Sequence, residues 1–177
     1  MASTVQPLNI TVDRGTADDL DSIMEVMRSA FGDRYGEAWT RSQCAGILPM
    51  AGIALTIARD GLCHQVVGFS LTRIIAGESE LLLLAVAPEY QRRSVGSVLL
   101  DDFIQRSLAA GSRRMHLEVR DGNPAIAMYE ASGFSPAGRR KAYYRGGDGR
   151  RHDALTYARD AELSHPSIRV APKSQQD

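Results

Sequence analysis

The stretch from Gln91 to Ser97 contains the residue types and spacing best suited to holding a phosphate group. An apolar run ends at Pro88, a short polar loop follows, and a helix is expected to begin near Val95. The first turn of a helix offers free backbone N–H groups and the positive end of the helix dipole. Small residues allow close approach to that backbone and arginines add positive charge: Arg92, Arg93, Ser94, Gly96 and Ser97. The pattern favours a pyrophosphate site, while a plain solvated turn before a helix fits the same residues equally well.

The loop matches neither the P-loop pattern nor the glycine-rich dinucleotide fingerprint. It resembles instead the motif of the GCN5-related N-acetyltransferase (GNAT) family, in which backbone amides after the fourth strand bind the pyrophosphate of coenzyme A. Gln91 and Gly96 match the first and last positions of that motif, and Ser94 stands where a glycine is usual. If this position needs a positive φ, a non-glycine residue costs about 1 kcal/mol or more.

The resemblance extends over about residues 8–160 and is closest to ribosomal-protein-alanine acetyltransferases of the RimI type. Four stretches carry it: A-W-T-R-S-Q at 38–43, L-E-V-R at 117–120, A-M-Y-E-A-S-G-F at 127–134, and R-R-K-A-Y-Y at 139–144 followed by D-G-R-R-H-D-A-L at 148–155. It implies acetyl-CoA as cosubstrate and a primary amine as acceptor. The expected acceptor is the N-terminal α-amine of a protein, as in the RimI type a ribosomal protein.

Acetyl transfer to an amine needs a base for the amine and an acid for the departing thiolate. The resemblance assigns Glu118 as general base and Tyr129 as general acid. A carboxylate acting through water suffices, because an α-amine has a pKa of about 8 and is partly neutral near pH 7. Glu80 is the competing base, and Glu118 could instead be an exposed strand carboxylate paired with Arg120 or a neighbour.

The resemblance also implies further contacts with the two substrates. The cofactor set is Leu84, Ala85 and Val86 through the backbone of a splayed strand, Gln91, Arg92, Arg93, Ser94, Val95, Gly96, Ser97, Asn123 and Tyr129. Related sequences carry an asparagine seven residues before the tyrosine, whereas Asn123 is six before it, so that contact is lost or remade by Asn123. Tyr143 and Tyr144 are expected to hold the acceptor, with Tyr35 and Trp39 as the opposite wall; core packing is an alternative for these aromatics, above all for Trp39.

The totals describe an ordinary single globular domain. The chain has 177 residues with 21 basic and 21 acidic side chains, and the zero net charge argues against direct nucleic-acid binding. Two cysteines are too few for a disulfide framework, and the histidines lack metal-ligand spacing, so we expect no metal. No signal peptide or membrane-length apolar run is visible, which makes a cytoplasmic protein without membrane contact the default expectation, as a monomer or weak homodimer.

The hydrophobic pattern places these residues on a mixed α/β domain with one central sheet. Strands are expected at 8–12, 53–59, 65–75, 80–87, 114–120, 139–145 and 154–159, and helices at 17–31, 40–48, 95–110 and 124–132, with Thr16 as N-cap and Gly111 as C-cap. The resemblance makes this the GNAT fold: a mostly antiparallel seven-stranded sheet with about four helices, splayed between strands 4 and 5. Residues 1–7 are expected to be a flexible N-terminus, 8–160 the domain, and 161–177 a tail.

Two other functions remain open from the sequence. One is an acetyltransferase for a small-molecule amine, for which a deep acidic pocket would argue. The other is a module that binds acetyl-CoA without turnover, suggested by the departures at Ser94 and Gly122.

Overall fold

A seven-stranded sheet forms the centre of the molecule in a computed structural model that describes residues 9–32 and 34–161. The strands are β1 (Ile10–Arg14), β2 (Ile53–Asp60), β3 (Val66–Ile75), β4 (Glu78–Val86), β5 (Arg114–Arg120), β6 (Ser135–Arg145) and β7 (Arg151–Asp160), and the helices are α1 (Leu20–Phe31), α2 (Arg41–Ile47), α3 (Val95–Ala109) and α4 (Ile126–Ala131). Short 3-10 turns span Ala17–Asp19 and Pro88–Tyr90. The strand order is β1-β2-β3-β4-β5-β7-β6, and all neighbours are antiparallel except β4 and β5. The predicted fold class is confirmed.

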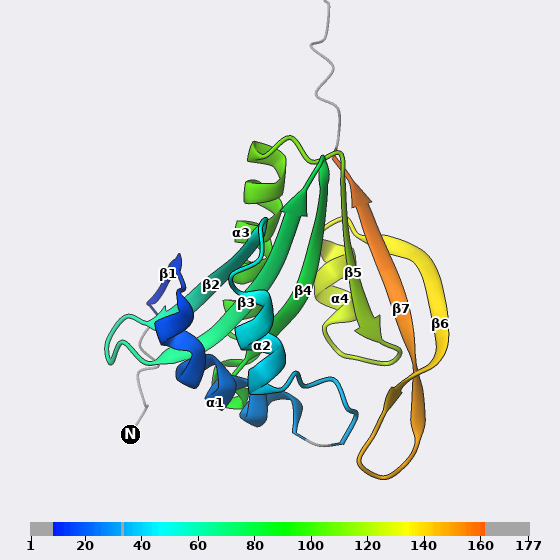
Figure 1. Cartoon of the computed structure of the whole chain (residues 1–177), viewed down its shortest axis with the longest axis horizontal. Coiled ribbons are helices and arrows are strands. Elements are labelled where there is room, and N and C mark those ends of the chain that lie inside the picture. The colour runs from blue at the N-terminus through cyan, green and yellow to red at the C-terminus, as the bar shows by residue number, and fades with distance from the viewer. Residues whose placement is uncertain (1–8, 33, 162–177) are drawn as a thin grey trace, which may run out of the picture.

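Helices cover both faces of the sheet, α1 and α2 in front and α3 and α4 behind in the view of Figure 1. On the front, Ile23 and Met27 of α1 pack with Phe69 of β3 in one buried cluster. On the back, Phe103 of α3 and Met115 of β5 belong to a second cluster. Burial of each such side chain contributes about 1.5–3 kcal/mol to the free energy of folding. The two clusters therefore hold the helices against the two faces of the sheet.

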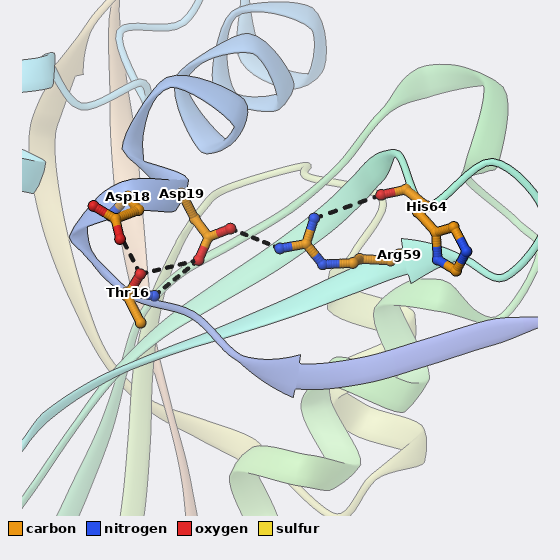
Figure 2. Close-up of polar contacts among 5 residues, drawn as sticks. All are labelled: Thr16, Asp18, Asp19, Arg59 and His64. Atoms are coloured by element: carbon orange, nitrogen blue, oxygen red, sulfur yellow. Dashed lines mark hydrogen bonds and ion pairs between the residues drawn. The ribbon is translucent and has the colours of Figure 1, made fainter.

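The start of α1 is tied to β2 by a polar cluster (Figure 2). The Thr16 hydroxyl accepts a hydrogen bond from the Asp18 N–H, and the Asp19 carboxylate accepts one from the Thr16 N–H at 2.9 Å. This reciprocal capping confirms the predicted N-cap, although the first turn is a 3-10 turn. Asp19 also pairs with Arg59 at 2.6 Å. Partial burial raises the pKa of the Asp19 carboxyl, but the hydrogen bond from the Thr16 N–H and the Arg59 guanidinium outweigh it and lower the pKa. The helix therefore begins at a fixed place on the sheet.

Strands β4 and β5 pair only over their first residues and then part. Their parallel ladder runs from Glu78 opposite Arg114 to Leu81 opposite Leu117 and stops there. Immediately after it, Leu82 is an extra residue on β4, because Leu71 pairs with Leu83 and Thr72 with Leu81. A bulge of this kind bends a strand and increases its twist. Figure 1 shows the two strands adjacent at one end and well separated at the other, so the predicted splay is confirmed.

The outer strands show where the predicted boundaries were wrong. Strand β6 begins at Ser135 and not at 139, because it is an edge strand and Pro136 needs no ladder partner on its open side. Strand β7 begins at Arg151 and not at 154, so the loop that connects it to β6 spans only residues 146–150. The expected flexible N-terminus and nearly all of the expected tail lie outside the described residues. No helix in the described ranges is long and apolar enough to cross a membrane.

The loop between β4 and α3 carries two residues with left-handed backbone. Ser94, the N-cap of α3, has φ 65°, and Arg92 has φ 57°. Serine therefore occupies the conformation in which the related motif has glycine, at a cost of about 1 kcal/mol. Gln91 holds the other end of the loop, since its side-chain amide donates to the Val86 carbonyl at 3.0 Å.

We predict opposite effects of two substitutions at Ser94. Ser94→Gly should leave the free energy of unfolding unchanged or raise it by up to about 1 kcal/mol, because relief of backbone strain is partly offset by a more flexible unfolded chain. Ser94→Val should lower it by about 1–3 kcal/mol, because a β-branched residue tolerates a positive φ poorly. Urea unfolding of the three proteins checks this, and equal stabilities for the Gly and Val variants would contradict it.

Candidate active site

The gap between β4 and β5 opens into a pocket of about 560 Å³. Backbone and side chains of both parted strands line it, and its ends reach the α1–α2 loop, the start of α3, and α4. The pocket brings together fourteen of the residues singled out from the sequence: Tyr35, Trp39, Leu84, Ala85, Val86, Gln91, Arg92, Ser94, Gly96, Ser97, Glu118, Asn123, Tyr129 and Tyr144. Residues spread over more than a hundred positions of sequence thus share one cavity.

The α3 end of the pocket has the properties of an anion site. Within the described residues, the first main-chain bond of α3 runs from the Val98 N–H to the Ser94 carbonyl, which leaves the three preceding N–H groups without intrahelical partners. Gly96 lies against α4, where a Cβ would come within 3.2 Å of the Met128 sulfur. The absence of a side chain at Gly96 therefore keeps the helix start close to both α4 and the pocket.

Two predicted cofactor residues point elsewhere. The Val95 side chain is buried in the core beside Leu99, so only its backbone is available to a ligand. The Arg93 guanidinium lies 5.5 Å from the centre of the Tyr90 ring and does not line the pocket. The Tyr90 hydroxyl in turn donates to Asp60 at 3.0 Å, which anchors this side of the loop to β2.

Tyr129 projects from α4 into the pocket from a buried position. Burial is the main cause that raises the pKa of its hydroxyl, and the charge of Glu37 adds to the effect. The helix is positioned by Asn123, whose side-chain oxygen accepts a hydrogen bond from the Ala125 N–H at 2.9 Å. Asn123 therefore lines the pocket and also fixes the turn that precedes α4. The raised pKa keeps the hydroxyl of Tyr129 protonated at neutral pH.

The two candidate bases lie in different depressions. Glu118 lines the pocket, and both of its carboxylate oxygens accept from one nitrogen of Arg140, at 2.9 and 3.1 Å. Its partner is thus Arg140 of β6 and not Arg120. Glu80 pairs with Arg73 at 2.5 Å and lies in a separate depression of about 440 Å³ at the closed end of the strand pair. Of these two candidates, Glu118 lines the same cavity as Tyr129 and Glu80 does not.

The aromatic residues expected to hold an acceptor divide between pocket and surface. Tyr35, Trp39 and Tyr144 line the pocket, and Trp39 also packs against the front core cluster. Tyr143 is 46% exposed, with its ring against Tyr144 and the Arg140 guanidinium 4.0 Å from its centre. Burial, together with the charges of Glu37 and Glu118, raises the pKa of Tyr144 to about 12.

A buried ion pair in the pocket had not been expected from the sequence. Glu37 of the α1–α2 loop pairs with Arg120 of β5 at 3.2 Å, and both side chains are only 10% exposed. Arg120 also lies 3.7 Å from the centre of the Tyr35 ring. The sequence signal that could have indicated this pair is Arg120, which ends a strand of alternating apolar and polar residues. If such an arginine is buried, it needs a carboxylate partner. Nothing in the sequence identified Glu37 as that partner. In the described part of the chain, no cluster of three or more histidine, cysteine or acidic residues could hold a metal ion.

We predict that Tyr129 and Tyr144 make stability depend on pH only in the alkaline range. Both hydroxyls keep their protons more tightly in the folded protein than in the unfolded chain, where tyrosine titrates near pH 10. Stability should therefore fall as the pH rises above about 10 and be unaffected below it. Ultraviolet titration of tyrosinate should show a step near pH 12 that Tyr144→Phe removes and Tyr143→Phe retains. Loss of the step in the Tyr143 variant alone would contradict this assignment.

Comparison with known proteins shows similarity to N-acetyltransferases. A bS18-alanine N-acetyltransferase of Escherichia coli K12 is 39% identical over 95 residues, which are 53% of this chain and 64% of that protein, just under two thirds of its length. The crystal structure of the E. coli ribosomal-protein-S18-alanine N-acetyltransferase superposes with a TM-score of 0.79 at 27% identity, covering 90% of this chain and 99% of that one.

A more distant structure shares the fold alone. Arabidopsis thaliana NAA60 in complex with acetyl-CoA gives a TM-score of 0.73 at 18% identity, covering 86% of this chain and 98% of that one. The model of the acetyltransferase (GNAT) family matches residues 20–134, which include α1, the parted strands, the α3 loop and Tyr129. The chain belongs to the acetyltransferase (GNAT) family.

Proposed function

We propose that this protein transfers an acetyl group from acetyl-CoA to a primary amine, the N-terminal α-amine of a protein. The observation that carries the proposal is the continuity of one pocket from the free amides of α3 to the side chains of Glu118 and Tyr129. An anion site, a carboxylate and a protonated phenol along a single cavity are the groups that this transfer requires. The RimI-type relatives, named for alanine N-acetylation of ribosomal protein bS18, support a protein acceptor such as a ribosomal protein.

The residues fit acetyl-CoA, which when bound supplies an activated thioester acetyl group. The N–H groups of Val95, Gly96 and Ser97 would hold the pyrophosphate, with Arg92 and the Ser94 hydroxyl beside them. Beyond Leu81, the β4–β5 ladder does not continue, so the backbone groups of Leu84, Ala85 and Val86 that face β5 can bind the pantetheine amides. The Val86 carbonyl already accepts one hydrogen bond from Gln91 and keeps one lone pair. Arg93 would act on the pyrophosphate only through long-range electrostatic attraction, because its side chain lies over the Tyr90 ring.

Glu118 is the proposed base. Arg140 occupies part of the hydrogen-bonding capacity of its carboxylate and fixes its orientation, and the remaining lone pairs can accept a proton from the acceptor ammonium, directly or through a water. Tyr129 is the proposed acid: its hydroxyl donates a proton to the departing sulfur as the new N–C bond replaces the C–S bond. The raised pKa of Tyr129 keeps that proton available at neutral pH.

A panel of acceptors tests the reaction and its substrate class. We expect coenzyme A release with peptides that have a free α-amine and much slower release with polyamines, amino acids or aminoglycosides. Tyr35, Trp39 and Tyr144 would contact the first residues of the peptide. Faster turnover of a small amine would support the alternative of a small-molecule acetyltransferase, and acetyl-CoA binding without any release would support a non-catalytic module.

Substitution of the proposed base and acid should separate catalysis from folding. Glu118→Gln and Tyr129→Phe should each lower kcat by about 10²–10⁴-fold with little change in acetyl-CoA affinity, as expected for loss of a proton-transfer group. Glu80→Gln, which removes the competing carboxylate from the other depression, should retain turnover near the wild-type rate. Circular dichroism and thermal melting control for folding, and a larger loss in the Glu80 variant than in the Glu118 variant would overturn the assignment.

A further inference from the structure

The buried carboxylate of Glu37 is the one acidic group in the pocket, besides Glu118, to which the proposed reaction gives no role. It comes from the α1–α2 loop, whereas Glu118 belongs to β5. One carboxylate oxygen accepts from the Asn123 amide at 3.1 Å and the other from Arg120 Nε at 3.2 Å. An ionised carboxylate has about four acceptor positions, so roughly two remain open.

Two tyrosine hydroxyls line the same pocket as these open positions. In the part of the chain that the structure describes, neither Tyr129 nor Tyr144 donates its hydroxyl proton to another protein group. The charge of Glu37 contributes to the raised pKa of both tyrosines, and Tyr144 contributes to that of Tyr129. The geometric basis is that Glu37, Tyr129 and Tyr144 all line this one pocket of about 560 Å³, where they can act on one ligand.

The positive charge of Arg120 does not cancel this arrangement, because it is shared among several partners. The guanidinium lies over the Tyr35 ring, and its Nη1 donates to the Asp121 carbonyl at 3.0 Å. The lone pairs of Glu37 that Arg120 and Asn123 leave unoccupied can still accept hydrogen bonds from a cation in the pocket.

The loop that carries Glu37 is held in place by direct backbone contacts. Gly36 has φ 68°, and a Cβ there would lie 2.2 Å from the Arg145 carbonyl oxygen. On the facing hairpin, a Cβ on Gly146 would lie 2.3 Å from the Arg34 carbonyl oxygen. Only glycines allow this approach, which fixes the loop against the β6–β7 hairpin and orients Glu37 before any ligand arrives.

We infer that Glu37, together with the hydroxyls of Tyr129 and Tyr144, binds the α-ammonium of the acceptor and so selects peptides with a free, charged N-terminus. An –NH₃⁺ group has three donors: Glu37 and the tyrosine hydroxyls take up two of them, and the third is left for Glu118 or its water. The assignment rests on the proposed function and adds to it a recognition step before proton transfer: Glu37 holds the ammonium, and Glu118 then removes its proton. Glu37 is thus a specificity residue and not the base.

Paired ligands isolate the contribution of the amine. The probes are an Ala-Tyr-Ala-Ala peptide amide and its counterpart with a propionyl group in place of the first alanine, which differ only in the amine. Calorimetry at pH 6.5 with coenzyme A present should show that the wild type binds the amine form at least about 10-fold more tightly, as expected for a charge-assisted hydrogen bond. Glu37→Gln should bring the two affinities within about 3-fold of each other by weakening the amine form alone. Its affinity for coenzyme A should be unchanged.

Two further variants separate recognition from folding. Asp19→Asn breaks another carboxylate–arginine pair, away from the pocket, and should lower the melting temperature while keeping the preference for the amine. Glu37→Asp keeps the charge and should restore part of the preference. An unchanged preference in Glu37→Gln would overturn the amine site and leave the proposed function intact. Absence of turnover with every α-amine in the peptide panel, despite coenzyme A binding, would overturn the proposed function and the amine site together.

Discussion

The parting of β4 and β5 is the constraint on which the rest of this structure depends. Backbone N–H and C=O groups that leave a ladder inside a protein must find other partners. The ladder ends at Leu81 and Leu117, and the extra residue Leu82 turns β4 away from β5. The bulge also directs Leu82 and Leu83 toward the front core cluster, whereas Leu81 packs in the back cluster. The front layer is thereby filled at the point where the sheet opens, and the freed edge of β4 becomes available to an extended ligand.

Elements with strong local signals were predictable from the sequence, and elements defined by distant partners were less so. Strand β5 was predicted with its observed ends, because Met115, Leu117 and Val119 alternate with polar residues and all three are buried. The end of α3 was equally clear, since Gly111 adopts φ 73° just after the helix. Strand β6 is the counter-example. Its interior bulge, where Ala142 has φ 54° and its N–H donates to the Asp153 side chain, depends on a residue of the next strand.

The candidate site divides in the same way. The proposed anion-binding end was predictable from the sequence because it lies within one short segment, and because the start of any helix offers free N–H groups to an anion. The other end was not, because Glu37 and Arg120 are brought together only by the fold. The pairing of Glu118 with Arg140 shows what the sequence could not predict. The sequence raised the possibility of an arginine partner, but the strand order β5-β7-β6 determines that Arg140 of β6 reaches across β7 to supply it. Motifs locate residue types, and topology decides which charges face each other.

The buried Glu37–Arg120 pair is better explained by geometry than by stability. Removing two charges from water costs about as much as their attraction returns, so such a pair contributes little net free energy of folding. It does, however, hold the α1–α2 loop to β5 at one fixed place across the open strands. Asn123 adds a second connection, from Glu37 to the turn that precedes α4, the helix of Tyr129. Glu37 thus contacts both walls of the pocket through two hydrogen bonds, whereas Glu118 is held within the sheet by Arg140. The two carboxylates are held by separate sets of partners, as the proposed division of roles requires: Glu37 to orient the acceptor and Glu118 to accept its proton.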